Sequence, residues 1–130
     1  VIWSILVLLW MGQARFGAMA KLGAGLGSAK PGGRGQDLDG VLPDAAQWKA
    51  HNYMHLMEQP TLFYATVAII AIADSHNSHL IHLAWAYVGL RIMHSLWQAV
   101  VNTIPVRFAL FIISTLCLLA MAILIALEIF

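Results

Sequence analysis

The chain consists of four long apolar runs separated by polar interruptions. A helix that spans a membrane needs about 20 mainly apolar residues, and only the first run is short, because Arg15 interrupts it. The pattern predicts an all-α fold, an integral membrane four-helix bundle in a single domain, residues 1–130. The expected helices cover about 1–19, 46–73, 79–101 and 106–130, with a glycine-rich loop over about 20–45. Asn102-Thr-Ile-Pro105 is expected to end the third helix, with the proline as its stop. From the short first run we also expect further residues before Val1.

Composition argues against a soluble globular domain. Hydrophobic residues make up 61% of the chain and charged residues 10%, and the mean hydropathy is +0.79, whereas soluble domains carry about 25% charged residues. A formal net charge of +1 indicates no polyanion-binding tail, so no nucleic-acid partner is expected. Cys117 is the single cysteine, which excludes an intrachain disulfide.

Glycines gather in the expected loop. Most of the ten glycines lie there, and some alternate in Gly23-Ala-Gly-Leu-Gly27. Phosphate-binding loops contain similar runs, but here no strand precedes the glycines and no Gly-Lys-Ser/Thr follows them. Nucleotide binding is therefore not predicted.

Basic residues predict the orientation of the helices. Lysines and arginines gather in and beside the first loop, and Arg107 borders the third connection, whereas the second connection has neither. Because cytoplasmic loops carry the excess of such residues, we expect the first and third loops in the cytoplasm and both termini outside. Arg15, at the edge of the first loop, is expected to extend its side chain toward the membrane interface.

Ionisable side chains open the second helix. His51, His55 and Glu58 are separated by four and three residues, which places them on one helical face. Such groups are costly beside a membrane-length segment unless they are paired, so they are candidates for a functional site.

A second polar stripe follows the third helix. Arg91, His94, Gln98 and Asn102 recur at intervals of three, four and four, and Tyr87 extends the stripe by one turn. Because polar groups avoid lipid, the stripe should face the protein interior or a neighbouring subunit. Two interpretations remain open: interhelical hydrogen bonds that hold the bundle together, and a ligand site.

The predicted topology brings the two polar groups to the same side of the membrane. The face that carries His51 and Glu58 begins at the cytoplasmic end of its helix, and Asn102 and Arg107 flank the third, cytoplasmic connection. An arginine there can bind a carboxylate bidentately or favour the thiolate form of a bound thiol. The arrangement suits a small anionic ligand whose reactive end meets a partner dissolved in lipid.

These motifs resemble the MAPEG family, the membrane-associated proteins of eicosanoid and glutathione metabolism. The resemblance spans about His51 to Phe111 and rests on Glu58-x-Pro60, Leu62-Phe63-Tyr64, the stretch from Tyr87 to His94 and the stretch from Asn102 to Arg107. It implies a homotrimer of four-helix subunits in a bacterial inner membrane, with glutathione as co-substrate between neighbouring subunits at the cytoplasmic side. It also implies that Glu58 contacts the bound tripeptide and that Arg107 stabilises the thiolate.

The first functional hypothesis is a glutathione-dependent transferase or peroxidase that acts on hydrophobic electrophiles. Arg107 is then the catalytic residue, and the lipid-soluble acceptor enters from the bilayer between helices. The expected substrate-binding residues are His51, His55, Glu58, Tyr87, Arg91, His94, Gln98 and Asn102.

The second hypothesis is a non-enzymatic protein of the same fold, either a lipid-binding module or an accessory subunit of a larger membrane complex. Glutathione-using members of the family carry an arginine and an asparagine where this chain has His51 and His55. A mostly neutral imidazole binds a carboxylate less well than a guanidinium does. Membrane lipid is an expected partner.

A metal or haem site is a third reading. His51, His55 and Glu58 have the spacing of a two-histidine, one-carboxylate site. Because isolated helical histidines more often form caps or hydrogen bonds, we predict no metal ligands.

Overall fold

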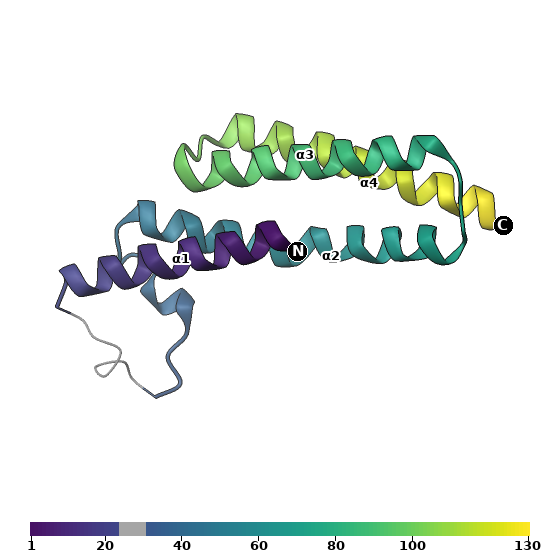
Figure 1. Cartoon of the computed structure of the whole chain (residues 1–130). Coiled ribbons are helices and arrows are strands. Elements are labelled where there is room, and N and C mark those ends of the chain that lie inside the picture. Colours follow the sequence, from purple (N-terminus) through teal and green to yellow (C-terminus); the bar gives the residue numbers. More distant parts are fainter. Residues whose placement is uncertain (24–30) are drawn as a thin grey trace. The chain divides into compact units, whose positions relative to one another are not determined.

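The computed structural model of the chain describes residues 1–23 and 31–130, and this part is helical with no strand (Figure 1). The prediction of an all-α fold with four long helices is confirmed. Gly25 and Gly27 of the alternating glycines, and Lys30 of the basic loop, lie outside the described residues. The elements are α1 (Ile2–Lys21), the short 3-10 helix η2 (Gly35–Leu38), α2 (Asp44–Ile72), α3 (Ser78–Val100) and α4 (Ile104–Ile129).

The connection between α3 and α4 differs from the expected one. Pro105 was expected to end the third helix, but it lies in the first turn of α4. A proline is tolerated there because the first N–H groups of a helix have no intrahelical partner. The turn is made instead by Asn102, whose φ of 57° lies in the left-handed region. Asparagine adopts this conformation more readily than most residues do.

The described residues divide into two compact units, Val1–His55 and Leu56–Phe130, and the helix α2 contributes to both. We call them unit 1 and unit 2 and describe each separately. The expectation of a single domain over residues 1–130 stays a prediction.

The core of unit 2 lies between α3, α4 and the second half of α2. The helices α3 and α4 run side by side (Figure 1). From α2, the ring of Phe63 stacks on that of Tyr87, with centroids 4.4 Å apart and 14° between the planes. The buried core residues are Phe63, Leu80, Tyr87, Leu118, Met121 and Ile125. The α4 members recur at intervals of three and four, which is one helical face.

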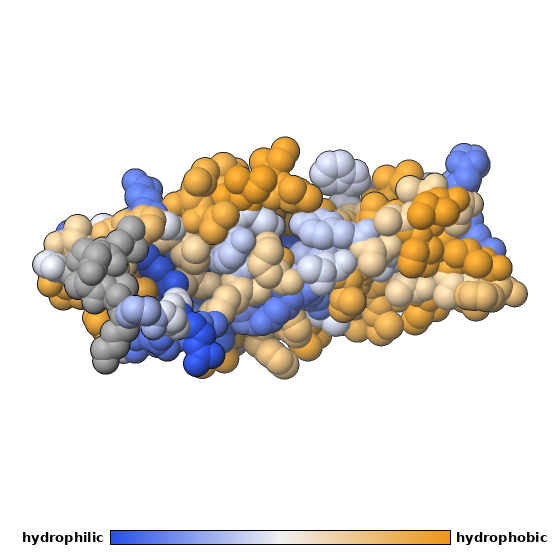
Figure 2. Space-filling view, turned by 90° about the horizontal axis from the view of Figure 1, so that it is seen from below, coloured by the Kyte–Doolittle hydropathy of each residue, from blue (hydrophilic) through white to orange (hydrophobic). Residues whose placement is uncertain are grey.

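The outer surface of unit 2 is apolar. Trp85 on α3 and Phe108 and Leu127 on α4 are exposed. In the view from below in Figure 2, hydrophobic side chains predominate at the right-hand end of the visible face. Among residues 1–23 and 31–130, two helices, α1 and α4, are long and apolar enough to cross a membrane. Large exposed apolar areas mark surfaces that meet a partner or a membrane.

Unit 1 is held together by a hydrogen-bond chain that begins at Arg15 on α1. Arg15 donates from Nε and Nη2 to Gln47 Oε1, at 3.2 and 3.0 Å, and from Nη2 to the carbonyl of Gly35 at 2.9 Å. Gln47 in turn donates from Nε2 to Asp39 Oδ1 at 2.7 Å. Arg15 therefore links α1 to η2 and α2, contacts that were not predicted from its expected position at the membrane interface.

Candidate functional site

The polar stripe on α3 is buried in unit 2. Tyr87, Arg91, His94 and Gln98 are 2%, 4%, 2% and 1% exposed. Their spacing places them on the face of α3 that packs toward the bundle, so the stripe faces the protein interior, as its period predicts.

His94 joins this stripe to the start of α4. Its Nδ1 lies 3.0 Å from the carbonyl oxygen of Arg107, and its Nε2 lies 3.1 Å from Gln98 Oε1. The Arg107 carbonyl can only accept, so Nδ1 carries a hydrogen. If the imidazole is neutral, Nε2 is an acceptor and needs a donor. The side-chain amide of Gln98 supplies that donor when it is turned so that its NH₂ group faces Nε2. Either way the imidazole orientation is fixed.

Arg107 itself is held at the beginning of α4. Its Nη1 donates to Asn102 Oδ1 at 2.7 Å, and the side chain is partly buried. Asn102 is fixed in turn, because its backbone N–H donates to the carbonyl of Trp97 at 2.7 Å. The unit therefore presents a preorganised guanidinium at the α3–α4 turn.

The left-handed conformation of Asn102 gives a prediction on stability. We expect Asn102→Ala to lower the free energy of unfolding by about 1 kcal/mol more than Asn102→Gly, because alanine is strained at positive φ and glycine is not. Both variants lose the contact with Arg107 Nη1. Denaturant unfolding of the two purified variants in mild detergent measures the difference, and equal stabilities would contradict this view of the turn.

The helix α2 brings a carboxylate and an amide to unit 2. Glu58 is exposed and interacts electrostatically with Arg91. Gln59 Nε2 donates to the hydroxyl of Thr115 on α4 at 2.6 Å, and that hydroxyl donates to the carbonyl of Phe111 at 2.7 Å. These contacts fix the register of α2 against α4 beside the stripe.

The two histidines of the expected site belong to unit 1. His51 Nε2 lies 3.3 Å from Asp39 Oδ1, and the two side chains are 41% and 46% exposed. His55, one turn further along α2, is partly buried. Within residues 1–23 and 31–130, no group of three or more His, Cys, Asp and Glu side chains is arranged to hold a metal ion.

Several polar residues beside the stripe were not predicted. Ser95 and Ser114 are buried in unit 2, and Gln59 and Thr115 pair across two helices. Ser95 directly follows His94 in the sequence and could have been found by its position. The Gln59–Thr115 pair is separated by 56 residues, and no local pattern indicates it.

A comparison with models of known protein families shows which family the chain belongs to. The model of the MAPEG family matches residues 1–127. The chain belongs to the MAPEG family. No curated protein and no solved structure gives a match.

Membership agrees with the structure in two respects. MAPEG proteins are membrane helical bundles, and this MAPEG chain has four long helices in its described part, of which two are apolar enough to span a bilayer. The chain is therefore a membrane protein of this family, and the charged groups of unit 2 are its candidate site.

Proposed function

We propose that this MAPEG chain is a glutathione-dependent transferase that acts on hydrophobic electrophiles. One observation carries the proposal. Arg107 is partly buried and held by Asn102 at 2.7 Å, in the same unit as the buried Arg91 and its electrostatic partner Glu58. This set provides two cations and one anion.

The charges of that set complement those of glutathione. At neutral pH the tripeptide carries two carboxylates, one ammonium group and a thiol. We assign Arg91 to a carboxylate, Glu58 to the ammonium group and Arg107 to the sulfur. The Tyr87 hydroxyl is buried without a hydrogen-bond partner among the described residues, and a bound ligand is the kind of partner such a group requires.

The proposed chemistry is nucleophilic attack by the glutathione thiolate. Ionisation of the thiol releases a proton to solvent, and the Arg107 guanidinium stabilises the remaining charge on sulfur. The thiolate forms a bond to the electrophilic carbon, and the leaving group departs with its bonding electrons. The hydrophobic acceptor reaches the site from the bilayer, which the exposed apolar residues of α3 and α4 face. A hydroperoxide acceptor would make the same site a peroxidase.

We infer that the chain crosses the membrane with all four helices and, from its membership of the MAPEG family, that it forms a homotrimer. The distribution of side chains on α3 supports the crossing. Its polar residues Arg91, His94 and Gln98 are buried, whereas its apolar residues Trp85, Met93 and Val100 are exposed. A helix at a water-facing surface has the opposite arrangement, with apolar residues buried and polar residues exposed. The distribution of lysines and arginines supports cytoplasmic first and third loops and termini outside, in a bacterial inner membrane.

A second candidate is a non-enzymatic member of the family, a lipid-binding module or an accessory subunit. The hydrogen bonds of His94 favour it, because they join Gln98 and the backbone of Arg107 and so serve to hold the bundle together. His51 is likewise engaged with Asp39 and has no guanidinium fork for a carboxylate.

Calorimetric titration of the purified chain with reduced glutathione tests the proposal. We expect saturable binding, weakened about tenfold by Glu58→Gln, since that change removes one charge-assisted contact. Glu128→Gln is the matched control: Glu128 accepts from the Ser75 hydroxyl in the same unit and should leave binding unchanged. Absence of binding at millimolar glutathione, or full affinity in Glu58→Gln, would overturn the proposal and favour the second candidate.

A further inference from the structure

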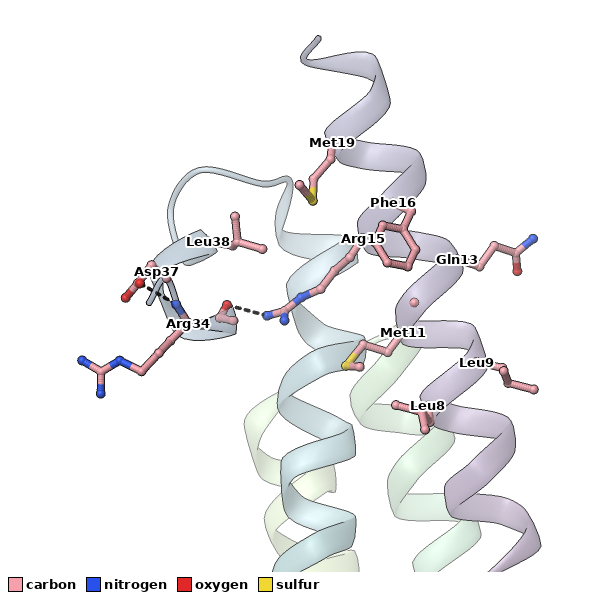
Figure 3. A pocket seen from close by; sticks show the side chains of 13 residues that line it. Leu8, Leu9, Met11, Gln13, Arg15, Phe16, Met19, Arg34, Asp37 and Leu38 are labelled. Atoms are coloured by element: carbon pink, nitrogen blue, oxygen red, sulfur yellow. Dashed lines mark hydrogen bonds between the residues drawn. The ribbon is translucent and has the colours of Figure 1, made fainter. Parts of the chain in front are cut away.

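Unit 1 contains a pocket that the proposed function does not use. It has a volume of about 870 Å³ and lies between α1 and residues 33–38. Its walls are mainly apolar, and Figure 3 shows Phe16 and Met19 of α1 on the side that Leu38 faces. Leu8 and Met11 continue the apolar wall along α1.

Arg15 supplies a positive charge in the wall of this pocket. Its hydrogen bonds go to neutral oxygens, those of Gln47 and Gly35, and its Nη1 donates to none of the described residues. Asp39 lies one hydrogen bond further away, on Gln47, and is also close to His51. Within residues 1–23 and 31–130, the Arg15 charge is thus not matched by a carboxylate in direct contact with it.

The other two charged residues of the wall turn outward. Asp37 accepts from the backbone N–H of Arg34 at 2.8 Å, and Figure 3 shows both side chains directed away from α1. Summed over Arg15, Arg34 and Asp37, the part of the wall that the structure describes carries one net positive charge. The cation that faces the pocket is Arg15.

The position of Arg15 along α1 matches the depth of a lipid headgroup. Arg15 lies six residues before the end of a helix that is long and apolar enough to cross a membrane, which corresponds to about 9 Å. Leu8 lies seven residues before Arg15, about 10 Å further along the helix. A molecule that places an anion at Arg15 and a hydrocarbon chain toward Leu8 follows the direction of a bilayer lipid.

We propose that this pocket binds an anionic glycerophospholipid from the bilayer. The headgroup phosphate contacts Arg15, and an acyl chain extends from there along α1 over Met11 and Leu8. Charge complementarity selects the anionic headgroup, because a zwitterionic headgroup adds a cation beside Arg15. The inference shares with the proposed function only the membrane location of the chain, and it involves no glutathione.

The space around Arg15 depends on Gly35. A Cβ added at Gly35 would lie 2.7 Å from Arg15 Nη1, so Gly35→Ala must displace the guanidinium while leaving its charge. This variant tests whether the position of the cation matters in addition to its presence.

Native mass spectrometry of the purified full chain tests the site. The chain is mixed with equal amounts of dioleoyl phosphatidylglycerol and dioleoyl phosphatidylcholine, and retained lipid is counted. We expect each chain to retain one phosphatidylglycerol molecule, and the amount of retained phosphatidylglycerol to exceed that of phosphatidylcholine about tenfold. A difference of this size corresponds to one charge-assisted contact. Arg15→Gln should remove the preference for phosphatidylglycerol, and Gly35→Ala should reduce it. Lys21→Gln is the control, because it removes an exposed charge at the end of the same helix, and it should retain the preference.

A second variant keeps the proposal testable if Arg15→Gln fails to fold. Leu38→Glu keeps Arg15 and its partners Gln47 and Gly35 in the sequence and places a carboxylate in the pocket wall, so it should also abolish retention of phosphatidylglycerol. Equal retention of both lipids by the unmodified chain, or an unchanged preference in folded Arg15→Gln or Leu38→Glu, would overturn the proposal. Arg107→Gln should leave retention unchanged, which separates a failure of this site from a failure of the glutathione site.

Discussion

Replacement of Arg107 by alanine should lower kcat/KM for conjugation of glutathione to a hydrophobic aryl halide about 100-fold at pH 7. A cation beside a thiol lowers the thiol pKa by one to three units, so its loss leaves a small fraction of thiolate. The guanidinium of Arg107 is already oriented by Asn102 at 2.7 Å, so the unmodified site needs little rearrangement to stabilise the charge. Stopped-flow or steady-state conjugation measures the loss.

The pH profile distinguishes this role from a structural one. In Arg107→Ala the rate should continue to rise with pH to a midpoint about two units higher than in the unmodified chain, because removal of the cation raises the thiol pKa. Arg107→Lys, which keeps the charge, should retain a midpoint near the original. Arg34→Ala is the control for loss of an exposed arginine. An unchanged midpoint in Arg107→Ala would mean that Arg107 does not stabilise the thiolate.

Replacement of Phe63 by alanine should lower the free energy of unfolding by about 3 kcal/mol. Phe63 is 8% exposed and stacks on Tyr87 at 4.4 Å, so its loss leaves a cavity between α2 and α3 and removes an aromatic pair. Packing is the main force between helices in lipid, and detergent cannot fill an enclosed cavity. Thermal or denaturant unfolding in mild detergent measures the change.

Phe108 offers a matched control for that measurement. It is 62% exposed on α4, so Phe108→Ala removes the same atoms and no packing inside unit 2. We expect its stability to stay within about 0.5 kcal/mol of the unmodified chain. Equal losses in the two variants would show that the stacked pair is not part of the stabilising core.

The sequence predicted those parts of the fold that depend on local pattern. Four apolar runs predicted four helices, and the intervals between Arg91, His94 and Gln98 predicted one buried face, because side chains three and four residues apart lie together on a helix. The prediction that Pro105 ends the third helix was wrong, because Pro105 lies in the first turn of α4. A proline disfavours a helix before it but is accommodated in the first turn of the next one, and the conformation of Asn102 ended α3 instead.

The contacts between distant segments could not be predicted. Arg15 binds Gln47 and Gly35, which lie 32 and 20 residues away, and His51 pairs with Asp39 across a glycine-containing loop. Such pairs depend on how the loop folds back, which no helical period encodes. For the same reason the sequence grouped His51 with Glu58 by spacing and did not indicate its carboxylate partner.

The central claim is that this MAPEG chain binds glutathione as a thiolate. The ultraviolet difference spectrum of the purified chain with reduced glutathione at neutral pH tests it most directly, with an oxidised-glutathione sample as the control that has no thiol. We expect a saturable thiolate band that is absent in Arg107→Ala. Saturable binding without that band, or no binding at millimolar glutathione, would contradict the claim.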